Sequence, residues 1–483
     1  MTRTTKTLAS LLLFFAPVAL QAQNDSEVIE SFKKYRDKMM SDYQDFRNKI
    51  LSDYGAFLDS AWSEYATFAG IPLPSKPKPV VQPQAPPNYE PPVQPKPVVE
   101  EETSKPQLKP QPAPKPQPVP KPTPPPSPSQ KMVKVELYGI EVALPSLNMQ
   151  KNAAQLAQLK PAEIWDVLVN SDVEEVAQAI YEKAEIYSLG DWGTFKLVQH
   201  YAESSVGGSY NAVVCAQTAL LLIMGYKVSM ALTESGMVML LPFEQNVCDN
   251  TFVKINDEKY YLFPDGKYGS ISTPDVGQMQ GRKLDLVNRR GVRLPLDAKP
   301  FSLSYGGIAI HGNVNRNTIR MIDEYPVMQI QDYAATVFDA ELRKDVIKQI
   351  ESQIDVRDPL RAANDMLHFT QLAFNYKTDE EQFGHEKYFF FEELLYYPYS
   401  DCEDRSVFFA NLVRNILRYD VLLVGLPNHE ATAVALPFEP PKRNYVINVG
   451  STKYYICDPT YMRADVGMMH ENYFNSDPEL QEW

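Results

Sequence analysis

The strongest constraint on the fold is a proline-rich stretch from Ile71 to Lys131, which holds more than half of the chain's 40 prolines. Proline fixes φ and lacks a backbone N–H, so a stretch of this composition cannot build a helix, a sheet or a core. We interpret it as a polyproline-II spacer that could reach on the order of 150 Å, at about 3.1 Å per residue. Its PxxP content also suits an aromatic groove, but we favour the spacer. The chain is thus divided into a part before and a part after this spacer.

Residues 1–22 are typical of a secretory signal peptide. Arg3 and Lys6 precede the apolar run Leu8–Leu20 and the small residue Ala22, after which we expect cleavage. The run is short for a bilayer span, which argues against a membrane anchor, and no other stretch is long and apolar enough to cross a membrane. We therefore expect an exported protein, periplasmic or extracellular, with no transmembrane segment after signal removal.

Residues 23–70 carry an aromatic stripe whose members recur at spacings of mostly three and four, which predicts one long amphipathic helix or two. The stripe consists of Phe32, Tyr35, Met39, Tyr43, Phe46, Ile50, Tyr54, Phe57, Trp62 and Tyr65. Because large aromatic side chains fit a coiled-coil seam poorly, we expect this helix to dock on the body of the protein, on another copy or on a partner.

Charge and cysteine content exclude several classes of protein. The net charge of −14 argues against nucleic acid as a partner and gives no reason to expect an anionic membrane surface. The four cysteines are too few for a disulfide scaffold. A bridge between Cys215 and Cys248 is conceivable, but we favour two separate buried thiols. No clustered Cys and His spacing indicates zinc, so we predict neither a metal nor a cofactor.

A predicted helix that begins at Cys402 carries the candidate nucleophile. Asp401 is suited to be its N-cap, and Asp404 at the third helical position can complete a capping box. Apolar residues at 408, 409, 412, 413 and 416 continue with a helical period. At the first turn of a helix, the unpaired N–H groups and the macrodipole favour a thiolate.

Two later segments supply a base and an orienting group. His429 opens an alternating apolar run that predicts a strand, and Asp458 ends the next predicted strand before a proline turn. A Cys, a His and an Asp in this order can act as nucleophile, base and orienting group.

These segments resemble the Cys–His–Asp core of the transglutaminase-like superfamily, which shares its catalytic logic with papain-like cysteine peptidases. The resemblance covers about residues 355–483 and is carried by the DCED, NHEATAV and YYICDPTY segments. It implies acyl transfer from a peptide or isopeptide amide through a thioester on Cys402, with water or an amine as acceptor. We favour hydrolysis by a peptidase or amidase, because many exported bacterial members of the superfamily look like peptidases.

The region before this core looks like an earlier copy of it. Tyr210–Tyr226 resembles Cys402–Tyr419, the LPFE sequence at 241–244 recurs at 436–439, and Lys259–Asp265 resembles Lys453–Asp458. The order is the same and the separation is nearly constant, which indicates an internal duplication.

The first copy departs from the pattern at the candidate site. Alignment by eye puts Ser209 and Glu234 where the Cys and His stand in the second copy, and Asp265 is offset by one residue from the aspartate position. Cys215 lies too far inside the predicted helix to be a nucleophile, so we expect a core thiol. This copy is expected to serve structural support or substrate binding.

The segment Tyr388–Tyr399 before Cys402 is dense in aromatic residues. We expect most of them in the core, and assign only Tyr397 and Tyr399 to a substrate-binding cleft. The partner is then a peptide or protein substrate, with the cell envelope as one source. The alternative is a non-catalytic binding or scaffold protein built on two such folds, in which Cys402 is sealed away from any cleft.

The sequence thus predicts an α+β fold with two transglutaminase-like (papain-like) domains and a β-rich segment between them. The expected divisions are a signal peptide (1–22), an amphipathic helical segment (23–70), a proline-rich linker (71–131), a degenerate transglutaminase-like domain (132–270), a β-rich intermediate segment (271–338) and a transglutaminase-like catalytic domain (339–483).

Overall fold

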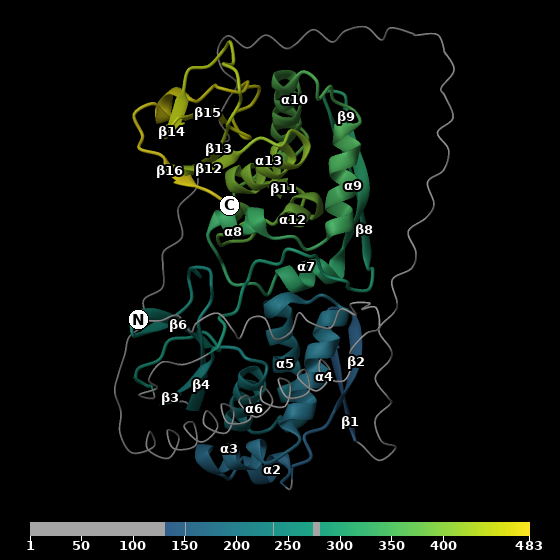
Figure 1. Ribbon diagram of the computed structural model, residues 1–483, viewed down its shortest axis with the longest axis vertical. Helices are drawn as coiled ribbons and strands as arrows, with labels where there is room; N and C mark the ends of the chain where they lie inside the picture. Colours follow the sequence, from purple (N-terminus) through teal and green to yellow (C-terminus); the bar gives the residue numbers. More distant parts are fainter. Residues whose placement is uncertain (1–130, 150, 235, 274–280) are drawn as a thin grey trace, which may run out of the picture. The chain divides into compact units, whose positions relative to one another are not determined.

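The computed structural model of the chain describes residues 131–149, 151–234, 236–273 and 281–483 (Figure 1). These residues form a mixture of helices and sheets, which confirms the α+β class. The predicted signal peptide and aromatic helix, and the proline-rich linker up to residue 130, lie outside the described residues. Within the described ranges, no helix is both long enough and apolar enough to cross a membrane.

The described chain opens with a hairpin, in which β1 (Met132–Leu137) pairs with β2 (Ile140–Pro145) around a turn at Tyr138 and Gly139. The helices that follow are α2 (Ala153–Leu156), α3 (Pro161–Val169), α4 (Val173–Ile186), α5 (Gly190–Val206) and α6 (Tyr210–Ile223). Helix α3 ends at Val169 because the polar side chains that follow it form hydrogen bonds with carbonyls of its last turn. Asn170 Nδ2 donates to Asp166 O (2.8 Å), and Ser171 Oγ donates to Leu168 O (2.6 Å).

A five-stranded sheet follows in the order β5-β6-β4-β3-β7. Its strands are β3 (Ser229–Thr233), β4 (Gly236–Leu241), β5 (Phe252–Ile255), β6 (Glu258–Phe263) and β7 (Ile271–Ser272). All its pairings are antiparallel, and β3 and β4 are almost wholly buried. Helix α6 packs against both of them (Figure 1).

In the described residues of the segment 271–338, namely 271–273 and 281–338, fewer residues lie in strands than a β-rich segment would have. It contains β7, the hairpin of β8 (Ala298–Tyr305) and β9 (Ile308–Asn315), and two helices, α7 (Arg316–Ile322) and α8 (Ile330–Ala335). Buried and more exposed residues alternate at 326–330, a pattern typical of a strand. These residues form no strand, although Met328 makes one isolated bridge with Val247. Met328 and Ile330 are buried because this loop packs on the core, which produces an alternating pattern without a sheet.

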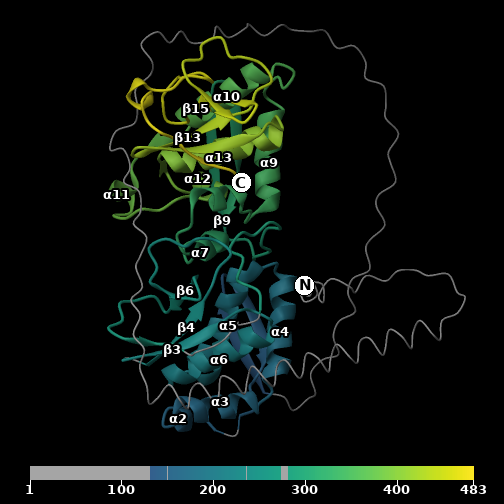
Figure 2. The same ribbon diagram turned by 60° about the vertical axis from the view of Figure 1, so that its left-hand side comes forward.

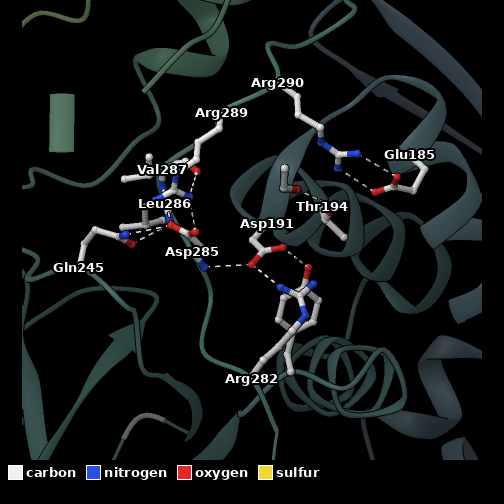
Figure 3. Close-up of polar contacts among 12 residues, drawn as sticks. Glu185, Asp191, Thr194, Gln245, Arg282, Asp285, Leu286, Val287, Arg289 and Arg290 are labelled. Carbon is white, nitrogen blue, oxygen red and sulfur yellow. Dashed lines mark hydrogen bonds and ion pairs between the residues drawn. The ribbon is translucent and has the colours of Figure 1, made fainter. Parts of the chain in front are cut away.

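Residues 281–291 are held against the first copy by two isolated β-bridges, Tyr226 with Arg282 and Phe243 with Leu284, and by side-chain contacts (Figure 3). Asp191, in the first turn of α5, accepts from Tyr226 Oη at 2.8 Å, from Asp285 N at 2.9 Å and from Arg282. The Arg282 guanidinium also stacks on the Tyr226 ring at 4.0 Å. A polar network therefore secures a stretch that has no regular secondary structure.

The second half contains the other large sheet, in the order β14-β15-β13-β12-β16. Its strands are β12 (Val421–Leu426), β13 (His429–Val434), β14 (Val446–Val449), β15 (Thr452–Cys457) and β16 (Glu479–Gln481). The helices are α9 (Ala340–Glu351), α10 (Pro359–Leu372), α11 (Asp379–Gln382), α12 (Phe391–Tyr396), α13 (Cys402–Ile416) and the 3₁₀ helix η1 (Glu471–Tyr473). Two short strands, β10 (Asn375–Tyr376) and β11 (Tyr399–Ser400), pair in parallel just before α13.

The two large sheets have the same topology. When β3 to β7 are matched in order to β12 to β16, the strand orders coincide. In each half, the helix that precedes the sheet packs on its two central strands: α6 on β3 and β4, and α13 on β12 and β13 (Figures 1 and 2). This is the arrangement that an internal duplication requires.

Candidate functional site

Helix α13 begins at Cys402, as the capping pattern predicts. Asp401 is the N-cap, and the Asp404 carboxylate accepts from Asp401 N at 3.2 Å, which forms the returning half of a capping box. The same carboxylate accepts from Phe389 N at 2.9 Å, so it ties the aromatic segment to the helix start. The thiol of Cys402 is thereby placed in the first turn, where the helix dipole favours negative charge.

Arg405 anchors this helix start from inside the core. Its side chain is fully buried and donates to Ser400 Oγ (3.0 Å), Gln371 O (3.1 Å) and Phe374 O (3.0 Å). Burial lowers the pKa of Arg405 to about 10, so the guanidinium remains charged at neutral pH. The sequence analysis did not single out this residue, which fixes the backbone immediately before Cys402.

His429 and Asp458 lie side by side on the neighbouring strands. His429 is the first residue of β13, Asp458 directly follows β15, and Nε2 of the imidazole is 2.8 Å from Asp458 Oδ2. The other carboxylate oxygen accepts from Thr460 N, Thr460 Oγ1 and Tyr461 N, each at 2.9 Å. The carboxylate is therefore held in a fixed position against the imidazole.

Each member of this pair favours the charged form of the other. Burial acts to raise the pKa of Asp458, but the charge and hydrogen bond of His429, with bonds from Thr460, bring it below its usual value. Burial acts to lower the pKa of His429, but Asp458 outweighs it. The hydrogen bond and charge of Cys402 also raise the pKa of His429, which lies well above its usual value. The geometry therefore supports an imidazolium at neutral pH.

The structure places Asp458 against His429, and Cys402 is close enough to be among the groups that act on the pKa of the imidazole. Because Nε2 is bound to Asp458, Nδ1 is the imidazole nitrogen that remains for the thiol. Sγ of Cys402 also lies 3.2 Å from Glu403 Oε2. All three side chains are enclosed: Cys402 is 1% exposed, His429 3% and Asp458 2%. The expected convergence is present, and the expected opening to solvent at the thiol is not.

Glu403, whose carboxylate contacts the thiol, belongs to a cluster of buried carboxylates. Within the described part of the chain, oxygens of Asp379, Asp401 and Glu403 lie within 4.8 Å of one another. Carboxylate oxygens are ligands for hard cations, but an acidic cluster alone does not establish a metal site, and the prediction of no metal stays a prediction. A negative charge on Glu403, at 3.2 Å from Sγ, would oppose a thiolate on Cys402.

The two tyrosines assigned to a cleft occupy different surroundings. Tyr397 stacks on Phe389 with centroids 5.0 Å apart, and its hydroxyl donates to Asp323 at 3.2 Å, so it belongs to an aromatic cluster. Tyr399 is 39% exposed and lies three residues before Cys402, with the Lys377 ammonium 5.4 Å from its ring centroid. Their role in binding substrate stays a prediction.

A residue that the sequence analysis missed covers His429. The ring of Tyr473 stacks on the imidazole with centroids 5.1 Å apart and planes 13° apart. Tyr473 ends η1 in the C-terminal tail. Neither spacing nor periodicity connects it with the strand that carries His429, so no sequence signal could have found it.

The first copy presents a different set of residues, which corrects the alignment by eye. Ser209 is the N-cap of α6, so Tyr210 takes the position of Cys402 at the helix start. Gly236 pairs with Thr233 at the end of its hairpin as His429 pairs with Leu426, so Gly236 rather than Glu234 takes the His429 position. The alignment failed because the two LPFE sequences are not structurally equivalent: Leu241 is the last residue of β4, whereas Leu436 lies two residues beyond the end of β13.

In the first copy the position that matches His429 lies against Tyr210, which is 48% exposed. A Cβ at Gly236 would lie 3.2 Å from the Tyr210 ring, so only glycine leaves room for it there. Strand β6 ends at Phe263 and is followed by Pro264, which confirms the one-residue offset of Asp265. Cys215 is fully buried, as expected of a core thiol, and none of the four cysteines, all of which are described, forms a disulfide.

Comparison of the chain with protein-family models, with curated proteins and with solved structures found no match. The function is therefore inferred from the chain's own residues.

Proposed function

We propose that this protein is an exported, cysteine-dependent acyl-transfer enzyme that acts on peptide or isopeptide amides, with hydrolysis as its reaction. In this proposal residues 339–483 form a catalytic transglutaminase-like domain, and residues 132–270 form a second such domain without the catalytic set. The substrate is a peptide or protein, with the cell envelope as one source. The signal-like sequence at residues 1–22 supports export.

One observation carries the proposal: Cys402 opens a buried helix beside an imidazole that Asp458 holds through Nε2 at 2.8 Å. A nucleophile, a base and a group that orients the base are the three parts that covalent acyl transfer needs. Structural Cys, His and Asp residues have no need to converge. Cys402 is among the groups that raise the pKa of His429, which supports a thiol close to the imidazole.

The proposed reaction follows from this arrangement. Sγ of Cys402 attacks the amide carbonyl, and the oxyanion that forms is stabilised by the backbone N–H of Cys402 at the helix start. The C–N bond then breaks, and His429 gives its proton to the departing amine, which leaves a thioester. His429 next takes a proton from water as the water attacks the thioester. The C–S bond breaks, the acid is released and Cys402 is restored.

A second candidate is a non-catalytic binding or scaffold protein, and one observation favours it. The thiol of Cys402 is 1% exposed, so a carbonyl can reach Sγ only after the covering residues move. The degenerate first copy is consistent with the same alternative. The two candidates differ in whether Cys402 is chemically activated.

Alkylation by iodoacetamide across pH separates them. The mature protein and His429→Ala are labelled from pH 5 to pH 10, and each cysteine is followed by peptide mapping. The shape of the pH profile is the readout, because burial slows the reaction at every pH. Cys248 is an internal reference: burial raises its pKa, as does the charge of Asp249, so it should react only in alkaline solution.

If the protein is the proposed enzyme, Cys402 should react well below pH 8.5, which is about the pKa of an unperturbed thiol. The substitution His429→Ala should abolish this reaction at low pH. A Cys402 that follows the same alkaline profile as Cys248, with or without His429, would contradict the proposal. The protein would then be a scaffold. A positive result leads to a search among peptide and cell-wall substrates for amide cleavage that Cys402→Ser abolishes.

A further inference from the structure

The imidazole of His429 is held on two sides. Asp458 binds its edge through Nε2 at 2.8 Å, and Tyr473 covers one of its faces at 5.1 Å between centroids. The planes of the two rings differ by 13°, so the contact is a stack over the face of the imidazole. The His429 side chain is fully enclosed, whereas Tyr473 is partly exposed, so Tyr473 stands between the imidazole and solvent.

The stack does what the hydrogen bond cannot. A single bond to Nε2 fixes that nitrogen but permits the ring to tilt about it, and tilting moves Nδ1 away from the thiol. A flat aromatic neighbour on the face removes this freedom. It also favours the imidazolium, because the face of a tyrosine ring attracts a cation.

Tyr473 is itself held in place. Its N–H donates to His470 O at 3.0 Å, its carbonyl accepts from Ser476 N at 3.0 Å, and the His470 ring lies against it with centroids 6.3 Å apart. The pKa of Tyr473 also depends on the site: burial raises it, the His429 charge lowers it, and the charges of Asp458 and Cys402 raise it. The phenol and the site are therefore close enough to influence one another.

We propose that Tyr473 is a positioning residue that sets the ring plane of His429 so that Nδ1 faces Cys402. This inference rests on the proposed function. The titratable groups around the imidazole are Asp458 at its edge, Cys402 on the side of Nδ1 and the Tyr473 phenol on its face. Two more lie behind these, Glu403 beyond the thiol and His470 beyond the phenol.

The test is the pH profile of Cys402 alkylation by iodoacetamide in four full-chain variants. Tyr473→Phe keeps the aromatic face, Tyr473→Leu fills the space without one, and Tyr473→Ala removes both. Phe474→Ala is the matched control, because Phe474 is the next residue, is 43% exposed and stacks on Tyr445 rather than on His429. Thermal unfolding of each variant establishes that it is folded.

We expect Tyr473→Leu and Tyr473→Ala to slow alkylation at pH 6 by roughly 3- to 30-fold and to move the profile to higher pH. Tyr473→Phe and Phe474→Ala should behave as wild type. Faster alkylation in Tyr473→Ala would make Tyr473 a cover over the site and overturn the inference, as would an unchanged profile in Tyr473→Leu. If wild-type Cys402 itself shows no low-pH reaction, the proposed function fails before Tyr473 is tested.

Discussion

Asp458→Asn should destabilise the second sheet in a pH-dependent way. His429 and Asp458 are both buried, with Nε2 and Oδ2 2.8 Å apart. At an effective dielectric constant of about 20, unit charges at this separation attract by about 6 kcal/mol. The charges are spread over two groups, so the expected loss is nearer the 3–5 kcal/mol, roughly, that follows removal of one partner of a buried pair. Asn also turns an N–H donor or a weaker acceptor toward Nε2.

The pH window follows from the two pKa shifts. The pKa of Asp458 lies below its usual 3.8, so its contribution is present above that pH and is lost as the solution is acidified. The pKa of His429 lies above its usual 6.5, so its contribution is complete below that pH and is lost as pH rises through the raised value. The difference in stability of the second sheet between wild type and Asp458→Asn should therefore be largest between pH 3.8 and pH 6.5.

Hydrogen exchange of the β13 and β15 amides is a suitable assay, because it reports the opening of this sheet without requiring the whole chain to unfold in one step. Asp465→Asn is the control: Asp465 pairs with His368 and Lys442, each at 3.1 Å, but is 16% exposed, and its loss should cost about 1 kcal/mol or less. A loss at Asp458→Asn no larger than the control's, or one that does not change with pH, would refute the ion pair.

Three further changes test other parts of the structure. Glu403→Gln removes the carboxylate 3.2 Å from Sγ of Cys402 and should move its alkylation profile to lower pH, whereas a shift to higher pH would mean that Glu403 is needed as a proton acceptor. Gly236→Ala places a Cβ 3.2 Å from the Tyr210 ring at φ +132°, and should cost about 1–3 kcal/mol in thermal unfolding, with no loss if the ring moves freely. In Arg405→Lys, the shorter side chain cannot reach all three acceptors of the guanidinium, so the stability of α13 should fall by about 3–5 kcal/mol. Hydrogen exchange in α13 measures this loss, and a smaller loss would show that water enters the site.

Much of the second half could be predicted because the signals are local. The start of α13 follows from the Asp401 N-cap and the Asp404 capping box, both within one helical turn. The strands that carry His429 and precede Asp458 follow from alternating apolar residues. Where local signals were weak, the predictions were less accurate. Pro326–Ile330 alternates because it packs on the core, and the two LPFE sequences misled the alignment because they follow β4 and β13 at different distances.

The sequence by itself determined the candidate residues and the elements that hold them: Cys402 at a helix start, His429 opening a strand and Asp458 directly after the next. Capping and periodicity act over a few residues, and so they can be read along the chain. Only the tertiary structure decided the surroundings: the approach of Asp379 to the carboxylates that flank Cys402, the closure of the thiol from solvent and the Tyr473 ring on the imidazole. These contacts join segments far apart in the sequence, and they depend on how α13, the second sheet and the C-terminal tail pack together.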